Sequence, residues 1–260
     1  MIWAAFTSEW TKLKRKTLLL STFCGLAAAA SLFVILIFTQ APATGHGGLP
    51  SLRQLARPDG LIVGVDRAVI LLGIVAFGIA AAQTASEYSL GTLRQILVRQ
   101  PRRVRLLAGK MLGVVSFLLL AFAFASVVAF AVAVAAMRAR HGSTAAWFTA
   151  TGMTDLLRAL GNISLAVLGY AVLGLVIGLF VRSAVFAVIL GFAWIIAVEN
   201  IVTRIVPGTG RWMPGLSLEA VATGGGEGVN YAHGMLVGAG YLVVAVVAAA
   251  LTFARRDVTA

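Results

Sequence analysis

The sequence predicts an all-α integral membrane protein with six transmembrane helices. Hydrophobic residues make up 60% of the 260 residues and the mean hydropathy is +0.97, whereas a soluble domain is roughly 45–50% apolar. Charged residues divide the chain into six long apolar stretches. These stretches do not alternate in polarity as barrel strands do, and helices satisfy their own backbone hydrogen bonds in lipid.

Each apolar stretch is long enough to cross a hydrocarbon core of about 30 Å, which takes about 20 helical residues. We therefore expect a single transmembrane domain over residues 1–260, with an interfacial segment at residues 1–16. The spans are expected at residues 17–38, 68–86, 111–137, 159–181, 183–203 and 234–254.

Basic residues are distributed unequally between the two sides of this topology. Six spans place both termini on one side, which carries thirteen of the 21 basic residues and a net charge of +10, against +2 on the other side. Short basic loops stay in the cytoplasm, so both termini are expected there. Because topology partitions the charge, the pI of about 11.2 does not indicate nucleic-acid binding.

The first span has one alternative interpretation. A basic segment, an apolar run and Ala41-Pro42-Ala43 resemble a secretory signal with its cleavage site. A signal core is about 7–15 residues long, however, and this apolar run is longer. The length favours a retained span.

Residues 2–16 predict an amphipathic helix before the first span. Glu9 and Lys12 lie away from its apolar face, with the basic groups toward water. The pattern is typical of a helix in the membrane interface, with rings at headgroup depth. It is either an anchor or a lever that passes motion from a cytoplasmic partner into the first span. The apolar face consists of Trp3, Phe6, Trp10 and Leu13.

A short cytoplasmic helix is expected directly after the second span. Gly91 allows a bend, Thr92 can cap the helix, and Pro101 stops it. Such a helix is either a docking element for a soluble partner or part of a basic loop that only sets topology. Its apolar face, at helical spacing, consists of Leu93, Ile96 and Leu97.

These residues carry a resemblance. The run Glu-Tyr-x-x-Gly-Thr-Leu-Arg at residues 87–94 resembles the first cytoplasmic loop of bacterial ABC transporter permeases of type 2 (ABC-2). Residues 9–13, 198–199 and 211–215 are also similar to that family, and the likeness covers the whole chain in span number, length and order. Asn200 departs from it, since many of these permeases have proline there.

The resemblance implies a permease subunit that works as a homodimer or heterodimer and pairs with a separate ATP-hydrolysing subunit. The short helix and the N-terminal helix would form the contact that transmits ATP-driven closure. Glu87 would pair with Arg94 or with a basic group of the partner. The coupling residues implied are Glu87, Tyr88, Gly91, Thr92, Leu93 and Arg94.

Enzyme motifs are absent from the sequence. It contains neither Gly-x-x-x-x-Gly-Lys-Ser/Thr nor His-Glu-x-x-His. The single cysteine, Cys24, excludes an intrachain disulfide and a cysteine metal cluster. We therefore expect no catalytic residue, metal or cofactor in this chain, and ATP would bind to the partner subunit.

Glu199 is the only acidic residue inside a predicted span, near its outer end. A carboxylate at membrane depth is costly and usually has a partner or lines a pathway. Arg204, about one turn away, is the candidate partner. The two residues are expected to form an outer gate or substrate contact, or else a structural pair; a hydrogen bond from Glu199 into the outer loop is the remaining alternative.

Glycines spaced four residues apart predict close helix packing, including a seam between two copies. Such pairs occur at residues 174 and 178, 234 and 238, and 109 and 113.

The expected function is that of a permease subunit of an ATP-driven exporter in the bacterial cell membrane. The expected partners are an ABC ATPase subunit, a second permease subunit and membrane lipid, and not nucleic acid. One alternative is a carrier driven by an ion gradient, which would normally need polar or acidic residues near mid-membrane. Another is a non-transporting membrane scaffold or immunity protein, which would work without an ATPase.

Overall fold

The chain folds into an all-α bundle, which confirms the predicted fold class. The computed structural model describes residues 2–42, 49–89, 103–181, 183–226 and 228–255. Over these residues the chain is 87% helical and has no strand. In this described part, six helical segments are long and apolar enough to cross a membrane.

The spanning segments contain no proline, which would interrupt a helix, and the described prolines lie in the connections or at the start of a short helix. Each segment contains one predicted span, except that Ser183 precedes the fifth, and most extend beyond it. The segments are α2 (Lys16–Gln40), α4 (Gly60–Ser89), α6 (Arg103–Ala139), α7 (Ala150–Val181), residues Ala184–Ile205, and α11 (Tyr231–Arg255).

The fifth segment changes its helical geometry along its length. It begins as α8 (Ala184–Phe192), continues as the π-helical η2 (Ala193–Val198) and ends as α9 (Glu199–Ile205). The side-chain Nδ2 of Asn200 donates to the carbonyl oxygen of Ile196 at 3.0 Å. π turns are rare and are frequently found at functional sites, and this one directly precedes Glu199.

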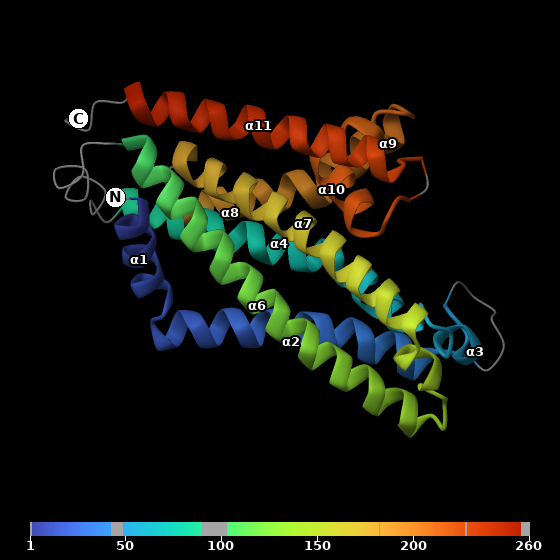
Figure 1. The fold of residues 1–260 in the computed structure, drawn as a ribbon. Helices are drawn as coiled ribbons and strands as arrows, with labels where there is room; N and C mark the ends of the chain where they lie inside the picture. The colour runs from blue at the N-terminus through green and yellow to red at the C-terminus, as the bar shows by residue number, and fades with distance from the viewer. Residues whose placement is uncertain (1, 43–48, 90–102, 182, 227, 256–260) are drawn as a thin grey trace.

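The helices α1 and α2 begin, and α11 ends, at one end of the bundle (Figure 1). We call this the terminal end, and the opposite one the distal end. The distal end carries the short helices. They are α3 (Leu52–Leu55), η1 (Ala145–Phe148), η3 (Gly210–Trp212) and α10 (Pro214–Ala222).

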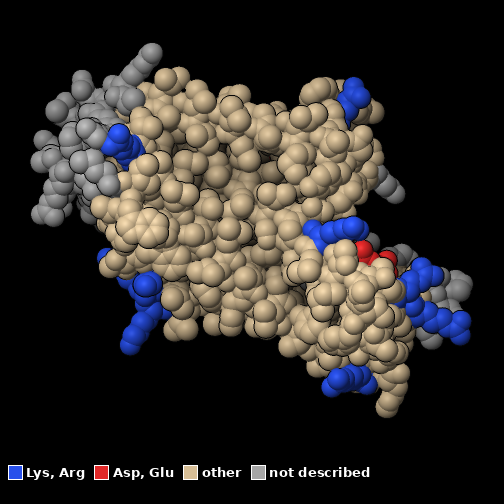
Figure 2. All heavy atoms as spheres, viewed as in Figure 1, with Lys and Arg blue, Asp and Glu red and all other residues tan. Residues whose placement is uncertain are grey.

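Charged side chains gather near the two ends of the face shown in Figure 2, and the middle of that face carries none. The spanning helices also expose large apolar side chains, such as Phe186 of α8 and Leu236 of α11, which are 68% and 75% exposed. An apolar belt between two charged ends suits a lipid environment. The bundle is therefore that of a multi-pass membrane protein.

The glycine pairs of α7 and α11 are used inside the chain. A Cβ atom on Gly174 would lie 2.2 Å from the carbonyl oxygen of Phe77, and one on Gly178 would lie 2.5 Å from that of Ala81. Gly234 similarly contacts the backbone of Ser217 in α10. Gly174 and Gly178 thus let α7 approach α4, and Gly234 lets α11 approach α10, within one copy of the chain.

Candidate functional site

The N-terminal helix α1 (Ile2–Leu13) crosses the terminal end of α6 rather than continuing into α2. Arg15 has φ −58° and ψ 130°, an extended conformation that separates the two helices. In Figure 1, α1 runs across the direction of α2. A helix in this orientation suits the membrane interface.

Small residues allow α1 to lie directly on α6. A Cβ atom on Gly109 would come within 2.5 Å of the Ala5 Cβ and 2.9 Å of the Ile2 carbonyl oxygen. One on Gly113 would come within 2.7 Å of the Glu9 Cβ. Real Cβ atoms do not approach so closely, so these glycines form a seat for α1. The third glycine pair therefore packs against α1, a contact that the sequence did not predict.

The aromatic side chains of α1 form a continuous row. The rings of Trp3 and Phe6 stack at 5.0 Å, Phe6 contacts Trp10 at 6.1 Å, and Trp10 meets Phe117 of α6 edge-on. The indole N–H of Trp10 donates to Ser116 Oγ at 3.0 Å. Trp3 is exposed and Leu13 is buried, so the predicted face is shared between the surface and the interior.

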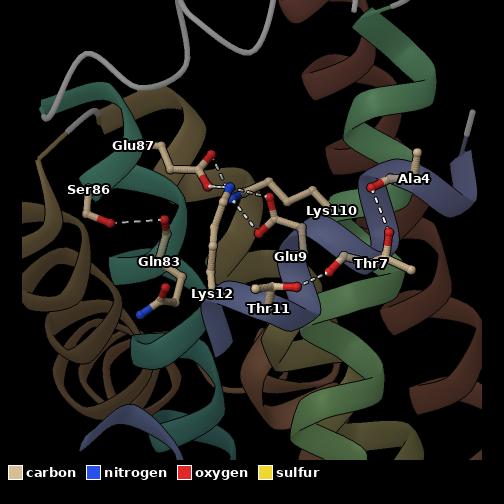
Figure 3. Close-up of polar contacts among 9 residues, drawn as sticks. All are labelled: Ala4, Thr7, Glu9, Thr11, Lys12, Gln83, Ser86, Glu87 and Lys110. Carbon is tan, nitrogen blue, oxygen red and sulfur yellow. Dashed lines mark hydrogen bonds and ion pairs between the residues drawn. The ribbon is translucent and has the colours of Figure 1, made fainter. Parts of the chain in front are cut away.

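Glu9 and Lys12 of α1 point toward α4 and α6, which corrects the expectation that the basic Lys12 on this side of the helix points toward water. Glu9 is 5% exposed. It meets Lys12, Glu87 at the end of α4, and Lys110 of α6 in a compact group of four side chains (Figure 3). The cause is the glycine seat: it brings the Glu9 side of α1 onto α6, beneath the end of α4.

Within this group, which we call the ion-pair cluster, the charges alternate. Lys12 Nζ lies 2.8 Å from Glu9 Oε1 and 2.8 Å from Glu87 Oε1. Lys110 Nζ lies 3.4 Å from Glu9 Oε2 and 2.9 Å from Glu87 Oε2. Each carboxylate therefore contacts both ammonium groups, and the net charge of the four residues is zero.

Because the cluster is buried, each of its charges depends on its partners for stability. Glu87 is 8% and Lys110 4% exposed, and a buried charge without a partner costs several kcal/mol. Glu87 also lies in the last turn of α4, where the helix dipole disfavours an anion. Burial lowers the pKa of Lys12, but the carboxylates of Glu87 and Glu9 outweigh it and hold that pKa above its ordinary value.

The cluster joins three elements at one point. Glu87 is three residues before the segment 90–102 and Lys110 is eight residues after it. The cluster thus holds both flanks of that segment against α1. The predicted coupling residues Gly91, Thr92, Leu93 and Arg94 lie outside the described residues, as does the side chain of Tyr88. Of the predicted set, the structure places Glu87 in the cluster.

Glu199 makes a different contact from the expected pair with Arg204. Its Oε1 and Oε2 accept the backbone N–H groups of Gly215 and Leu216, both at 2.9 Å. These amides belong to the first turn of α10, where N–H groups lack partners within the helix and favour an anion. Glu199 is 1% exposed, so it caps α10 from the end of the fifth span.

Arg204 lies on the surface and forms no ion pair with Glu199 in the described part of the chain. It is five residues further along the helix, which rotates it well away from Glu199. The predicted pair is therefore wrong, and the alternative of a hydrogen bond into the outer loop is confirmed. The hydroxyl of Tyr170 donates to the Gly215 carbonyl oxygen at 2.9 Å and holds the same turn from α7.

Within the described residues, no group of three or more His, Cys, Asp or Glu side chains could hold a metal ion. The fold and the terminal-end cluster define a helical multi-pass membrane protein with an N-terminal helix fastened to its second and third spans. Residues 64–259 match a family described as "Protein of unknown function (DUF2705)", and the chain belongs to this family. No curated protein matches the sequence.

Proposed function

We propose that this chain is the membrane subunit of an ATP-driven exporter of the ABC type. It would dimerise, form the substrate pathway, and receive motion from separate ATPase subunits at the terminal end. The basic residues at that end favour its placement in the cytoplasm of a bacterial cell.

The ion-pair cluster carries this proposal. An ATPase that pushes on the segment 90–102 displaces Glu87 or Lys110, and both of these side chains contact α1. The α1 helix in turn leads through Arg15 into α2. Force applied to one short segment would thus reach the first three spanning helices together, which is what a coupling contact requires.

Glu199 bears on the alternative of a gradient-driven carrier. Its carboxylate accepts two amide hydrogen bonds from α10 and has a structural role. The intramembrane acid on which that alternative rests is therefore already engaged, and the ATP-driven exporter is the better supported function.

The test is purification of the full chain from its own cells in mild detergent, followed by identification of co-purifying proteins and measurement of ATP hydrolysis. We expect a nucleotide-binding subunit in the complex. Glu87→Gln should lower the hydrolysis rate per assembled complex several-fold, because it weakens the link between the segment 90–102 and α1.

The matched control is Asp155→Asn, which removes a carboxylate at the distal end that lies 3.9 Å from Arg158. It should leave hydrolysis unchanged. A chain that functions in cells with no ATPase bound, or a Glu87→Gln complex with wild-type hydrolysis, would refute the proposal.

A further inference from the structure

A cavity of about 590 Å³, lined by both apolar and polar residues, opens at the distal end, between α9, η3, α10 and the following loop. Its size falls within the range of small-ligand sites, about 300–1,000 Å³. The charged and polar side chains that line it are those of Asn200, Thr203, Arg204, Arg211, Glu219 and Thr223. It lies apart from the ion-pair cluster, at the opposite end of the molecule.

The charged side chains of this cavity keep hydrogen-bonding capacity that the described residues do not use. Among the described residues, Arg204, Arg211 and Glu219 form no side-chain hydrogen bond or ion pair. The Arg211 guanidinium lies over the Trp212 ring at 5.7 Å, a contact that leaves its N–H donors available. Two cations and one acid thus line the same cavity with no ion pair among the described residues.

Two guanidinium groups and one carboxyl favour a ligand that carries both an anionic and a cationic group. Guanidinium groups bind phosphate through paired, charge-assisted hydrogen bonds. Burial raises the pKa of the Glu219 carboxyl above its ordinary value, so an ammonium group that paired with it would relieve an unfavourable ionisation. A ligand that carries both phosphate and a primary ammonium would satisfy all three side chains.

The surroundings of the cavity indicate that this ligand is a lipid. Arg204 lies in the last turn of α9, where the fifth span ends. On the same helix Ile201 and Ile205 are 54% and 72% exposed, and nearby Trp212 is 53% exposed. Exposed apolar residues followed by tryptophan mark the boundary between acyl chains and headgroups.

We propose that the cavity binds the headgroup of a zwitterionic phospholipid with a primary ammonium, its phosphate on Arg204 and Arg211 and its ammonium on Glu219. The acyl chains then follow the exposed face of α9. This inference does not depend on the proposed exporter function and can fail or succeed separately.

The test measures lipid binding to the purified full chain in detergent by native mass spectrometry. Short-chain phosphatidylethanolamine is compared with phosphatidylcholine, which lacks ammonium N–H donors, and with phosphatidylglycerol, which lacks the cation. Wild type should prefer phosphatidylethanolamine about tenfold, since a hydrogen bond to a charged group is worth about 1.5–3 kcal/mol. Equal binding of all three lipids would overturn the proposal without any variant.

Substitutions in the cavity test which side chains bind the phosphate and which binds the ammonium group. Arg204→Gln combined with Arg211→Gln should weaken binding of all three lipids at least about tenfold. Glu219→Gln should remove only the preference for phosphatidylethanolamine. Arg53→Gln, at an exposed arginine of α3, is the matched control and should bind as wild type. Wild-type affinity and preference in the cavity variants would contradict the site.

Soluble phosphoethanolamine separates the two sources of this headgroup chemistry. If the ligand is a lipid, phosphoethanolamine should bind far more weakly than the short-chain lipid, because it lacks acyl contacts with α9. Equal affinity would overturn the lipid assignment.

Discussion

Single residues decide the chemistry of the terminal end. Glu9, Glu87 and Lys110 are buried charges, and each is tolerated because the ion-pair cluster supplies opposite charges on two sides. Removing one member leaves a charge excess in a poorly solvated place. Removing an acid and a base together restores neutrality.

Lys110→Met should therefore destabilise the protein markedly, by about 3 kcal/mol, because Glu9 and Glu87 would share Lys12 alone. The measurement is the unfolding midpoint in a denaturing-detergent titration. Adding Glu9→Gln to Lys110→Met should recover part of the loss. Lys16→Met, at an exposed lysine at the start of α2, is the control; an equal loss in this control would argue against the cluster.

The pH dependence of folding stability is expected to come from Lys12. Its pKa is raised in the folded protein, so the stability it contributes is complete below the ordinary lysine pKa of about 10.4 and is lost as the pH rises through the folded pKa. Thermal stability should fall more steeply in wild type than in Lys12→Gln as the pH is raised from 9 to 12. Parallel curves for the two proteins would exclude this linkage.

At the distal end, Glu199 holds the first turn of α10 against the end of the fifth span. Glu199→Gln keeps one acceptor oxygen but loses the second and the charge at the α10 N-terminus, so it should lower the unfolding free energy by about 1–3 kcal/mol. Arg204→Gln should have little effect in lipid-free detergent. A loss from Arg204→Gln as large as that from Glu199→Gln would restore the pair expected from sequence.

At the scale of elements, the glycine seat determines where α1 lies. Gly109→Ala or Gly113→Ala should push α1 away from α6, because the added methyl group meets the backbone of α1 or the Glu9 side chain. Spin labels on α1 and α6 should show a longer and broader distance in these variants. Gly25→Ala, whose Cβ meets nothing within 4 Å, is the control, and an unchanged distance at Gly109→Ala would contradict the seat.

The elements also show what sequence could and could not predict. The six apolar segments followed from hydropathy alone, since lipid imposes length and low charge on each helix. The side of α1 that packs did not follow, because the aromatic row of Trp3, Phe6 and Trp10 is a stronger pattern than a single glutamate. A signal was present: Ala5 and Glu9 have the same spacing as Gly109 and Gly113. This matched spacing can be interpreted only once α1 and α6 are known to be in contact.

For the whole molecule, the topology brings distant residues to one end. Glu9 and Lys110 are 101 residues apart in sequence, and hydropathy predicts that they share a membrane face but not that they touch. A hydrogen bond from Glu199 into the following connection was among the sequence-based alternatives, but the amides of Gly215 and Leu216 could not be named, because backbone groups leave no trace in the pattern of side chains. Charged side chains could be assigned to ends of the bundle, but not to their contacts.

For the whole molecule, we propose that an ATP-hydrolysing partner binds at the terminal end. The most direct test places a photo-crosslinking amino acid at Val104, an exposed position at the start of α6, and for comparison at Arg53 of the distal end. After irradiation of intact cells, we expect a covalent adduct with a nucleotide-binding protein from position 104 and not from position 53. Adducts with lipid alone at position 104, or the nucleotide-binding protein captured from position 53, would contradict the account.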